Sequence, residues 1–400
     1  MLRLVLRHKA FRFRVYPTPR QEARLRSWEN TLRSLWNLAH EQRLMGYGRS
    51  KSERRYPTAF DQINELTALR AEFPWFADVP RNVCAQLLVE LDKAWQRCFT
   101  KLARTPRWKR KGHDEPGLCE PHPKAWRIDG HVLRFPKLGP MRIVAHLALE
   151  GVPKTCTLKR DGDQWFASVA CEISVADPPP RTEPVIALDR GVVNIVADSD
   201  GRILKNPRFY EHAMRRLARA QRVVSRRKKG SRNREKAKAR VMRLSRKVRR
   251  QRDHVLHGIS STYAKSHGTV VVEALRTKDM IRVGGGLARS IGAVGWGRLI
   301  EQLRYKLAWS GGSLIEVNPA YSSQTCSACG HVAAESRCSQ ASFVCVACGL
   351  VEHADVNAAR VLKSRANRSA LLGEGTVPEA AQRTKKRLRV VRRKAESSAI

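Results

Sequence analysis

Two short apolar runs, each followed by a carboxylate, constrain the fold of this chain most strongly. Residues 185–188 (VIAL) precede Asp189, and residues 270–272 (VVV) precede Glu273. Such runs, rich in β-branched residues, are typical of central strands that are buried on both faces of a parallel sheet. Because ligands of open α/β sheets bind beyond the carboxyl ends of the strands, we expect both acids to line one cleft.

A third acid, Asp355, lies in the last helical segment, HADVNAARVL. Close carboxylates repel each other, so a divalent cation is their natural partner. Two Mg²⁺ ions about 3.5–4 Å apart, held by a few carboxylates, stabilise both the attacking and the leaving oxygen of phosphodiester cleavage. We therefore interpret Asp189, Glu273 and Asp355 as catalytic, Mg²⁺-binding residues. The alternative is three separate solvated acids, with Asp355 simply favouring a helix N-terminus.

The order of the predicted elements points to an RNase H-like α/β domain. After a Pro-rich boundary at residues 178–180, the pattern gives three strands, a pair of long helices over 208–265, a strand, a helix, a strand and a final helix. The three acids fall on the first strand, the fourth strand and the last helix. This placement is what a shared carboxylate site on such a sheet requires.

Four of the ten cysteines form two close pairs, Cys326–Cys329 and Cys345–Cys348, with fifteen residues between the pairs. This C-x₂-C…C-x₂-C spacing predicts a zinc site. Four thiolates complete a tetrahedral shell, so the single Zn²⁺ is expected to be structural. Cys338 lies between the pairs but does not fit their register, and the other five cysteines are scattered thiols.

The charge of the chain predicts a polyanionic partner. There are 77 Lys and Arg residues against 36 Asp and Glu, a formal net charge of +41. Neutralising phosphates releases counterions, which makes nucleic acid the expected partner. No stretch approaches the roughly 20 apolar residues of a membrane-spanning helix, and the N-terminus lacks the pattern of a signal peptide. We expect no membrane association and a location in the cytosol or nucleoid.

The positive charge is concentrated in the long helices, where nineteen Lys and Arg residues and one acid lie between Arg215 and Arg252. Like charges four residues apart destabilise a bare helix, and binding to a phosphate backbone removes that cost. Trp108 and Trp126 near basic residues stack on bases or, as the alternative, pack in a core. The candidate nucleic-acid contacts are Arg226, Arg227, Lys228, Lys229 and Arg232, with Arg107, Lys109 and Arg110 in an earlier loop.

The ordered motifs ALDRGVVNIVADSDG, VVVEALRTKDM, GWGRLIEQLRYK, SSQTCSACG and CVACGLVEHADVNAARVL resemble the TnpB family of transposon-encoded relatives of miniature type V CRISPR nucleases. AFRFRVYPTPRQ and LRFPKLG resemble its wedge-domain segments, so the resemblance covers about residues 9–365. It implies a guide RNA, recognition of a short transposon-adjacent motif, and cleavage of double-stranded DNA by one RuvC site. By motif, Asp189, Glu273 and Asp355 correspond to the RuvC acids and the four paired cysteines to the zinc ligands.

The resemblance also implies two catalytic Mg²⁺ ions, one Zn²⁺ and a guide RNA, in a prokaryotic cytosol. One protein is expected per RNA, with a dimer as the alternative. Three departures from the family pattern stand out: Arg190 follows the first acid, His353-Ala354 precedes the third, and Ala293-Val294 precedes Gly-Trp-Gly. All three acids are retained, so we expect activity.

We thus predict a multidomain α+β protein. An RNase H-like (RuvC) α/β domain carries a zinc-ribbon insertion, and an N-terminal β-barrel-like wedge domain carries an inserted helical recognition domain. The expected boundaries are 1–18 and 115–180 for the wedge domain, 19–114 for the recognition domain, 181–325 for the RuvC domain with its basic helical hairpin at 208–265, 326–349 for the zinc-binding target-nucleic-acid module, 350–366 for the last RuvC helix, and 367–400 for a disordered basic tail.

Three rival functions remain at this level. An RNA-guided DNA-binding repressor without cleavage should have lost an acid. A non-enzymatic RNA-binding protein explains the charge and the cysteines but not the acids at strand ends. A transposase that acts directly on element ends would bind DNA without RNA, and neither the cysteine pairs nor the basic helices argue against it.

Overall fold

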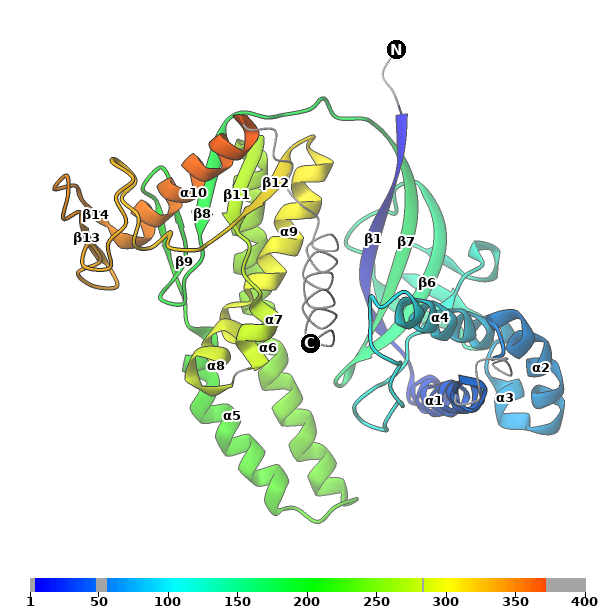
Figure 1. Cartoon of the computed structure of the whole chain (residues 1–400). Coiled ribbons are helices and arrows are strands. Elements are labelled where there is room, and N and C mark those ends of the chain that lie inside the picture. The colour runs from blue at the N-terminus through cyan, green and yellow to red at the C-terminus, as the bar shows by residue number, and fades with distance from the viewer. Residues whose placement is uncertain (1–3, 48–55, 283, 372–400) are drawn as a thin grey trace, which may run out of the picture. The chain divides into compact units, whose positions relative to one another are not determined.

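The computed structural model describes residues 4–47, 56–282 and 284–371, and these form two compact units that divide between Asp177 and Pro178 (Figure 1). The expected tail at 367–400 begins too early, because the last helix, α10, runs over Ala354–Leu371. The rest of that prediction, residues 372–400, lies outside the described residues.

The first unit is built on a seven-stranded antiparallel sheet with the order β2-β6-β7-β1-β5-β4-β3. Its central strand is the N-terminal one, β1, which pairs with β7 from Leu4 opposite Ala176 to Val15 opposite Trp165. The edges β2 and β3 share no ladder in the described chain, so the sheet is open where we expected a barrel-like closure. The strands are β1 (Leu4–Tyr16), β2 (Leu118–Glu120), β3 (Arg127–Asp129), β4 (Val132–Phe135), β5 (Gly139–Val144), β6 (Val152–Asp161) and β7 (Gln164–Ala176).

The helices of the first unit lie between β1 and β2 in the chain and share one core with the sheet. Alternate residues of β1, such as Phe11 and Phe13, face this core, as expected for a period of two. Trp28 and Leu32 enter it from α1, and Leu88 from α4. The helices are α1 (Pro19–Tyr47), α2 (Ala59–Glu72), α3 (Pro74–Asp78) and α4 (Arg81–Phe99), with a short 3₁₀ helix at Pro123–Ala125.

The second unit contains a five-stranded sheet with the order β10-β9-β8-β11-β12. The strands β8, β11 and β12 run parallel, and β9 and β10 continue the sheet antiparallel. The strands are β8 (Val185–Asp189), β9 (Asn194–Asp198), β10 (Ile203–Lys205), β11 (Thr269–Glu273) and β12 (Ser313–Val317). The two runs that precede Asp189 and Glu273 are therefore neighbouring parallel strands at the centre of the sheet.

Helices cover both faces of this sheet (Figure 1). Leu188 and Val272 pack in one core with α6 (Arg232–Ser266) and α9 (Trp296–Trp309). Ala187 and Val271 face the other side, where they pack with Leu362 of α10. Because successive residues of a strand point to opposite faces, strands buried on both sides need apolar residues at every position. The smaller helices α7 (Thr277–Arg282) and α8 (Gly285–Val294) precede α9.

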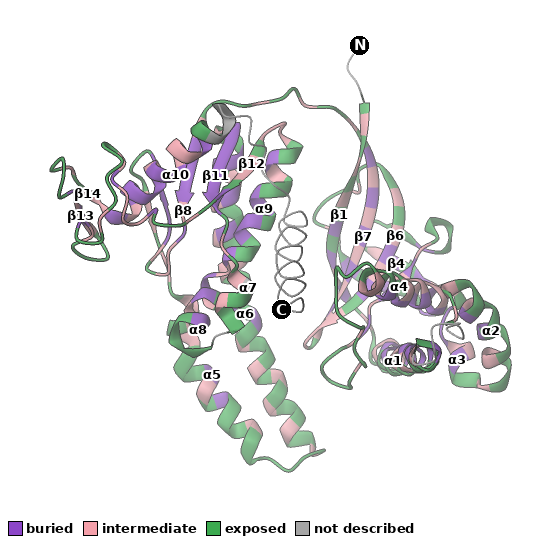
Figure 2. Ribbon diagram, viewed as in Figure 1, coloured by how far each residue is buried: buried purple, intermediate pink, exposed green. Residues whose placement is uncertain are grey.

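Two further parts of the second unit project from the sheet. The helix α5 (Phe209–Arg226) and the first half of α6 form an antiparallel hairpin, here called the basic hairpin, whose surface is largely exposed (Figure 2). Between β12 and α10 lies a compact segment with β13 (Ser342–Val344) and β14 (Val351–His353). No helix of the described chain is long and apolar enough to span a membrane.

Candidate active site

The two strand-end acids lie beside each other at the carboxyl edge of the sheet. Asp189 ends β8 and Glu273 ends β11, and the preceding residues Leu188 and Val272 are register partners. Asp355 is in the first turn of α10, the helix that packs against β8 and β11. Asp189, Glu273 and Asp355, here called the acid cluster, thus come from three elements that meet at one edge.

The charges of the acid cluster repel one another. Burial raises the pKa of Asp189 well above its usual range, and the neighbouring carboxyls of Glu273 and Asp355 raise it further. Burial also raises the pKa of Glu273, against the opposing effects of Arg190 and of hydrogen bonds with Ser322 and Asp189. A divalent cation bound among these oxygens would offset both the repulsion between the carboxyls and the cost of burying them in ionised form.

Several polar side chains hold two of the three acids in place. The Asn194 side-chain amide donates to Oδ2 of Asp355 at 2.9 Å, and the Arg337 guanidinium lies 3.8 Å from Oδ1 of the same carboxyl. The Ser322 hydroxyl donates to Oε1 of Glu273 at 3.5 Å. Asn194, Ser322 and Arg337 were missed at the sequence level, because each is brought to the acids only by tertiary folding from β9, a loop or the cysteine segment.

Arg190, the unusual residue after the first acid, is buried beside the cluster. Its guanidinium donates to the backbone carbonyl of Glu273 and lies 6.0 Å from the ring centre of Trp296. Its Nε is buried without a hydrogen-bond partner. Burial lowers the pKa of Arg190, while Glu273 opposes this shift. The sequence therefore places a fixed positive charge at the edge of the acid cluster.

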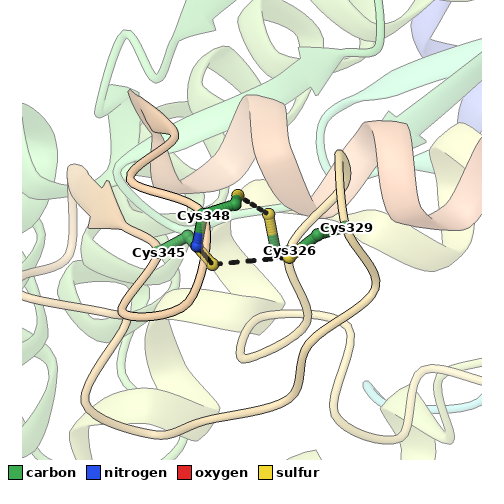
Figure 3. Close-up of side chains that lie close together, drawn as sticks. All are labelled: Cys326, Cys329, Cys345 and Cys348. Carbon is green, nitrogen blue, oxygen red and sulfur yellow. Dashed lines mark hydrogen bonds between the residues drawn. The ribbon is translucent and has the colours of Figure 1, made fainter.

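The four paired cysteines converge on one point (Figure 3). The sulfur atoms of Cys326 and Cys348 lie 3.6 Å apart, as do those of Cys329 and Cys345, and all four lie within 4.8 Å of one another. Zn–S bonds of about 2.3 Å in a tetrahedron place the sulfurs roughly 3.8 Å apart, so the donor set fits Zn²⁺. Backbone amides of Cys348 and Ala347 lower the pKa of Cys345 to about 6, whereas the neighbouring thiols of Cys329 and Cys345 raise the pKa of Cys348 to about 12.

The cysteine module, residues 326–349, is tied to the helix that carries Asp355. Asn357, fully buried on α10, accepts from the Ser327 amide at 2.9 Å and donates to the Thr325 carbonyl at 2.8 Å. Arg337, which lies between the cysteine pairs, is the cation beside Asp355. Cys338 is exposed and is not one of the four cysteines whose sulfur atoms meet.

Comparisons with known proteins place this chain. Residues 168–284 match a family model described as a probable transposase, OrfB_IS605. A protein of Escherichia coli strain K12 named "Putative RNA-guided DNA endonuclease InsQ" is 31% identical over 384 residues, which cover 92% of this chain and 94% of that relative. The chain belongs to the TnpB family. A Streptomyces pristinaespiralis relative, also named an RNA-guided DNA endonuclease, is 31% identical over 376 residues, covering 93% of this chain and 92% of that protein.

Further matches agree with this membership in the TnpB family. Residues 296–362 match a model described as the Cas12f1-like TNB domain, and 1–52 match one described as a helix-turn-helix domain, where the structure holds β1 and α1. A solved Cas12f1–sgRNA–target DNA complex has the same overall fold, with a TM-score of 0.52, 14% identity and coverage of 90% of this chain and 98% of that one.

The candidate nucleic-acid residues of this TnpB-family chain fall on two exposed segments. Those near residue 230 lie at the tip of the basic hairpin, and all are exposed: Arg226, Arg227, Lys228, Lys229 and Arg232. In the other segment Arg107 and Arg110 are exposed, but the Lys109 ammonium lies 4.2 Å from the ring centre of Trp36. Trp108 is 45% exposed, whereas Trp126 is buried at 5%, so the core-packing alternative holds for Trp126.

Proposed function

We propose that this chain is an RNA-guided DNA endonuclease that cuts double-stranded DNA at the acid cluster with the help of Mg²⁺. The observation that carries the proposal is the meeting of Asp189, Glu273 and Asp355 at one sheet edge. Curated relatives at 31% identity over more than nine tenths of the chain, which are named RNA-guided DNA endonucleases, support it.

Asp189, Glu273 and Asp355 would hold two Mg²⁺ ions, which supply an activated water and stabilise the leaving 3′-oxygen of the cut phosphodiester. The side chains of Asn194 and Ser322 orient two of these carboxyls through hydrogen bonds. Arg337 and Arg190 offset part of the carboxylate repulsion before any cation binds. The protein's own part in catalysis is thus to hold negatively charged oxygens at fixed positions.

The cysteine module would hold one structural Zn²⁺ through Cys326, Cys329, Cys345 and Cys348. Four sulfur ligands leave no open position for a water or a substrate. The module would position other parts of the site. Its bond with Asn357 fixes the start of α10, and its Arg337 lies beside Asp355. Zinc would therefore support the acid cluster without taking part in the chemistry.

The guide RNA would bind the exposed positive surface, with the basic hairpin as the main contact. Phosphate contacts of this kind set position and affinity but carry no sequence information. Base pairing between guide and target supplies the sequence specificity. One protein per RNA and a short adjacent DNA motif read by the first unit complete the proposal.

The decisive experiment uses the ribonucleoprotein as it is purified. The copurifying RNA is sequenced, a plasmid complementary to its guide segment is made, and cutting is measured with Mg²⁺ and with chelator. We expect cutting only with Mg²⁺ and a matching target, and none by Asp189→Ala, which keeps its RNA. Equal cutting by Asp189→Ala would refute the site, and RNA-independent binding to element ends would favour a transposase.

A further inference from the structure

Arg190 is a buried cation with no step of its own in the proposed chemistry. Only 6% of its surface is exposed, and it directly follows Asp189 in the chain. Its Nε is buried without a hydrogen-bond partner among the described residues. A charged group is costly to bury, and a buried donor without a partner adds to that cost. The presence of Arg190 at this position therefore needs an explanation beyond packing.

Two contacts hold the Arg190 guanidinium in place. One of its terminal nitrogens donates to the backbone carbonyl of Glu273, which links the residue after β8 to the last residue of β11. Its Cζ lies 6.0 Å from the ring centre of Trp296, and Nε1 of that tryptophan donates to the Gly191 carbonyl at 3.1 Å. Trp296 is buried, so it braces both the Arg190 side chain and the backbone that follows it.

The bond to the Glu273 carbonyl brings the guanidinium close to the acid cluster. The carbonyl and carboxyl carbons of one glutamate are four bonds apart, which is at most about 5 Å. A nitrogen bonded to the Glu273 carbonyl oxygen therefore lies within about 9 Å of the carboxyl carbon of the same residue. Charges at that distance are only partly screened by salt at a surface, and buried charges are screened much less. Asp189, the residue before Arg190, is the second acid in reach.

Two of the three carboxyls that attract Arg190 belong to the acid cluster. These three are Glu273, Glu316 and Asp189. Glu316 on β12 is itself paired with Arg304, whose guanidinium lies 2.5 Å from its Oε1. The charge of Arg190 therefore acts mainly on Glu273 and Asp189. A metal ion bound by these two acids would have to share them with a permanent cation.

We propose that Arg190 is a positioning residue that lowers the affinity of the acid cluster for divalent cations and holds its carboxyls together in their absence. The guanidinium and a metal ion are attracted by the same carboxyls and repel each other, so each weakens the binding of the other. The inference rests on the proposed function and deepens it, since it names what sets the Mg²⁺ concentration that the site needs.

Three substitutions separate the charge of Arg190 from its hydrogen bond. Arg190→Gln keeps an amide that can donate to the Glu273 carbonyl but removes the charge. Arg190→Lys keeps the charge without the planar fork, and Arg190→Met removes both charge and donor. Lys363→Gln is the matched control, because Lys363 is a cation on α10, the helix of Asp355, but is paired with Asp200 at 3.8 Å.

The first measurement needs no cutting of DNA. Fe²⁺ is added to the purified ribonucleoprotein in place of Mg²⁺, and with ascorbate and peroxide it generates radicals that cut the protein backbone beside its binding site. Fragments that end near β8, β11 and the start of α10 report occupancy of the acid cluster, separately from metal bound to the RNA. Asp189→Asn, which lacks one of the proposed ligands, gives the background.

Removing the charge of Arg190 should tighten the binding of Fe²⁺. A charge beside a carboxyl changes its affinity for a proton by roughly tenfold to a thousandfold, so we expect Arg190→Gln and Arg190→Met to reach half-maximal backbone cutting at an Fe²⁺ concentration about tenfold or more below that of the wild type. Arg190→Lys and Lys363→Gln should stay within a few-fold of the wild type. Unchanged or weaker binding in Arg190→Gln, or equal tightening in Arg190→Lys, would overturn the proposal, because a residue needed only for the fold would loosen the site when replaced.

The second measurement is single-turnover cutting of a matched plasmid across a range of Mg²⁺ concentrations. The half-maximal Mg²⁺ concentration should fall in Arg190→Gln by a factor similar to that for Fe²⁺, whatever the change in the maximal rate. An unchanged half-maximal concentration in a variant that cuts contradicts the inference. If the wild type never cuts, yet Arg190→Gln binds Fe²⁺ more tightly, the proposed function fails and the inference about Arg190 stands.

Discussion

The cysteine module and the acid cluster each bring together side chains that repel one another when ionised, but they differ in how completely that repulsion can be relieved. The four sulfurs lie within 4.8 Å of one another and come from two tight turns, so one soft ion completes the set. The three carboxyls come from two strands and a helix, and arginines offset only part of their charge. A metal ion whose coordination shell is filled by protein ligands stabilises the fold, whereas an ion whose shell is only partly filled by protein has room to bind a reacting phosphate.

The largest effect should come from breaking the filled shell. Cys345→Ser removes a buried ligand, and structural zinc contributes about 10–16 kcal/mol to the folding of small zinc domains. We expect the purified variant to lose its bound zinc by elemental analysis and its module to become sensitive to limited proteolysis. Cys338→Ser, which changes an exposed thiol outside the cluster, should keep both zinc and protection. Full zinc content in Cys345→Ser would contradict the assignment.

Removing a carboxyl from the acid cluster should have the opposite effect and stabilise the metal-free protein. Asp189→Asn removes a carboxyl that burial and its neighbours disfavour, so the unfolding temperature in chelator should rise. Cutting should fall by about 10³-fold or more, because metal-assisted charge stabilisation is worth several kcal/mol.

Calorimetry sharpens the test of Asp189. Mg²⁺ should raise the unfolding temperature of the wild type more than that of Asp189→Asn, because ligands that bind the native state stabilise it. The matched control is Asp200→Asn, which changes an exposed carboxyl paired with Lys363 beyond β9. A variant of Asp189 that is destabilised in chelator, or equally stabilised by Mg²⁺, would show that the acid does not belong to a cation site.

The link between the two sites should give a smaller effect. Asn357→Ala leaves the Ser327 amide and the Thr325 carbonyl without this side-chain partner, at a cost of about 1–3 kcal/mol for two partly buried groups. We expect zinc to remain bound while the cutting rate falls, since the start of α10 carries Asp355. Asn357→Asp still accepts from Ser327 and should be intermediate. Loss of zinc and cutting together would mean that the module, and not the link, had failed.

The sequence predicted those parts that depend on short-range pattern. The apolar runs before Asp189 and Glu273 are adjacent buried strands, and the cysteine spacing is a four-sulfur cluster. It did not predict that β1 would be the central strand of the first unit, because pairing partners far along the chain leave no local signal. Arg337 beside Asp355 was missed for the same reason. The helix α10 also outruns its predicted end, since charged and small residues at 367–371 permit helix as well as coil.

Glu29, a buried carboxyl outside the acid cluster, shows how burial changes a pKa when an arginine is paired directly with the carboxyl. Glu29 on α1 lies 3.0 Å from Nε of Arg160. Burial still raises its pKa to about 7, although Arg160 opposes the shift. The folded first unit therefore holds this proton more tightly than the unfolded chain does. The contribution of Glu29 to stability is fully present below about pH 4.5 and is lost as the pH rises through about 7.

Glu29→Gln should flatten that part of the pH profile. The effect is of order 1–3 kcal/mol in the free energy of unfolding, measured by denaturant titration between pH 4.5 and 8. Glu22→Gln, on the exposed face of α1, should leave the slope unchanged. If Glu29→Gln keeps the wild-type slope, direct pairing with Arg160 is enough to keep a buried carboxylate ionised.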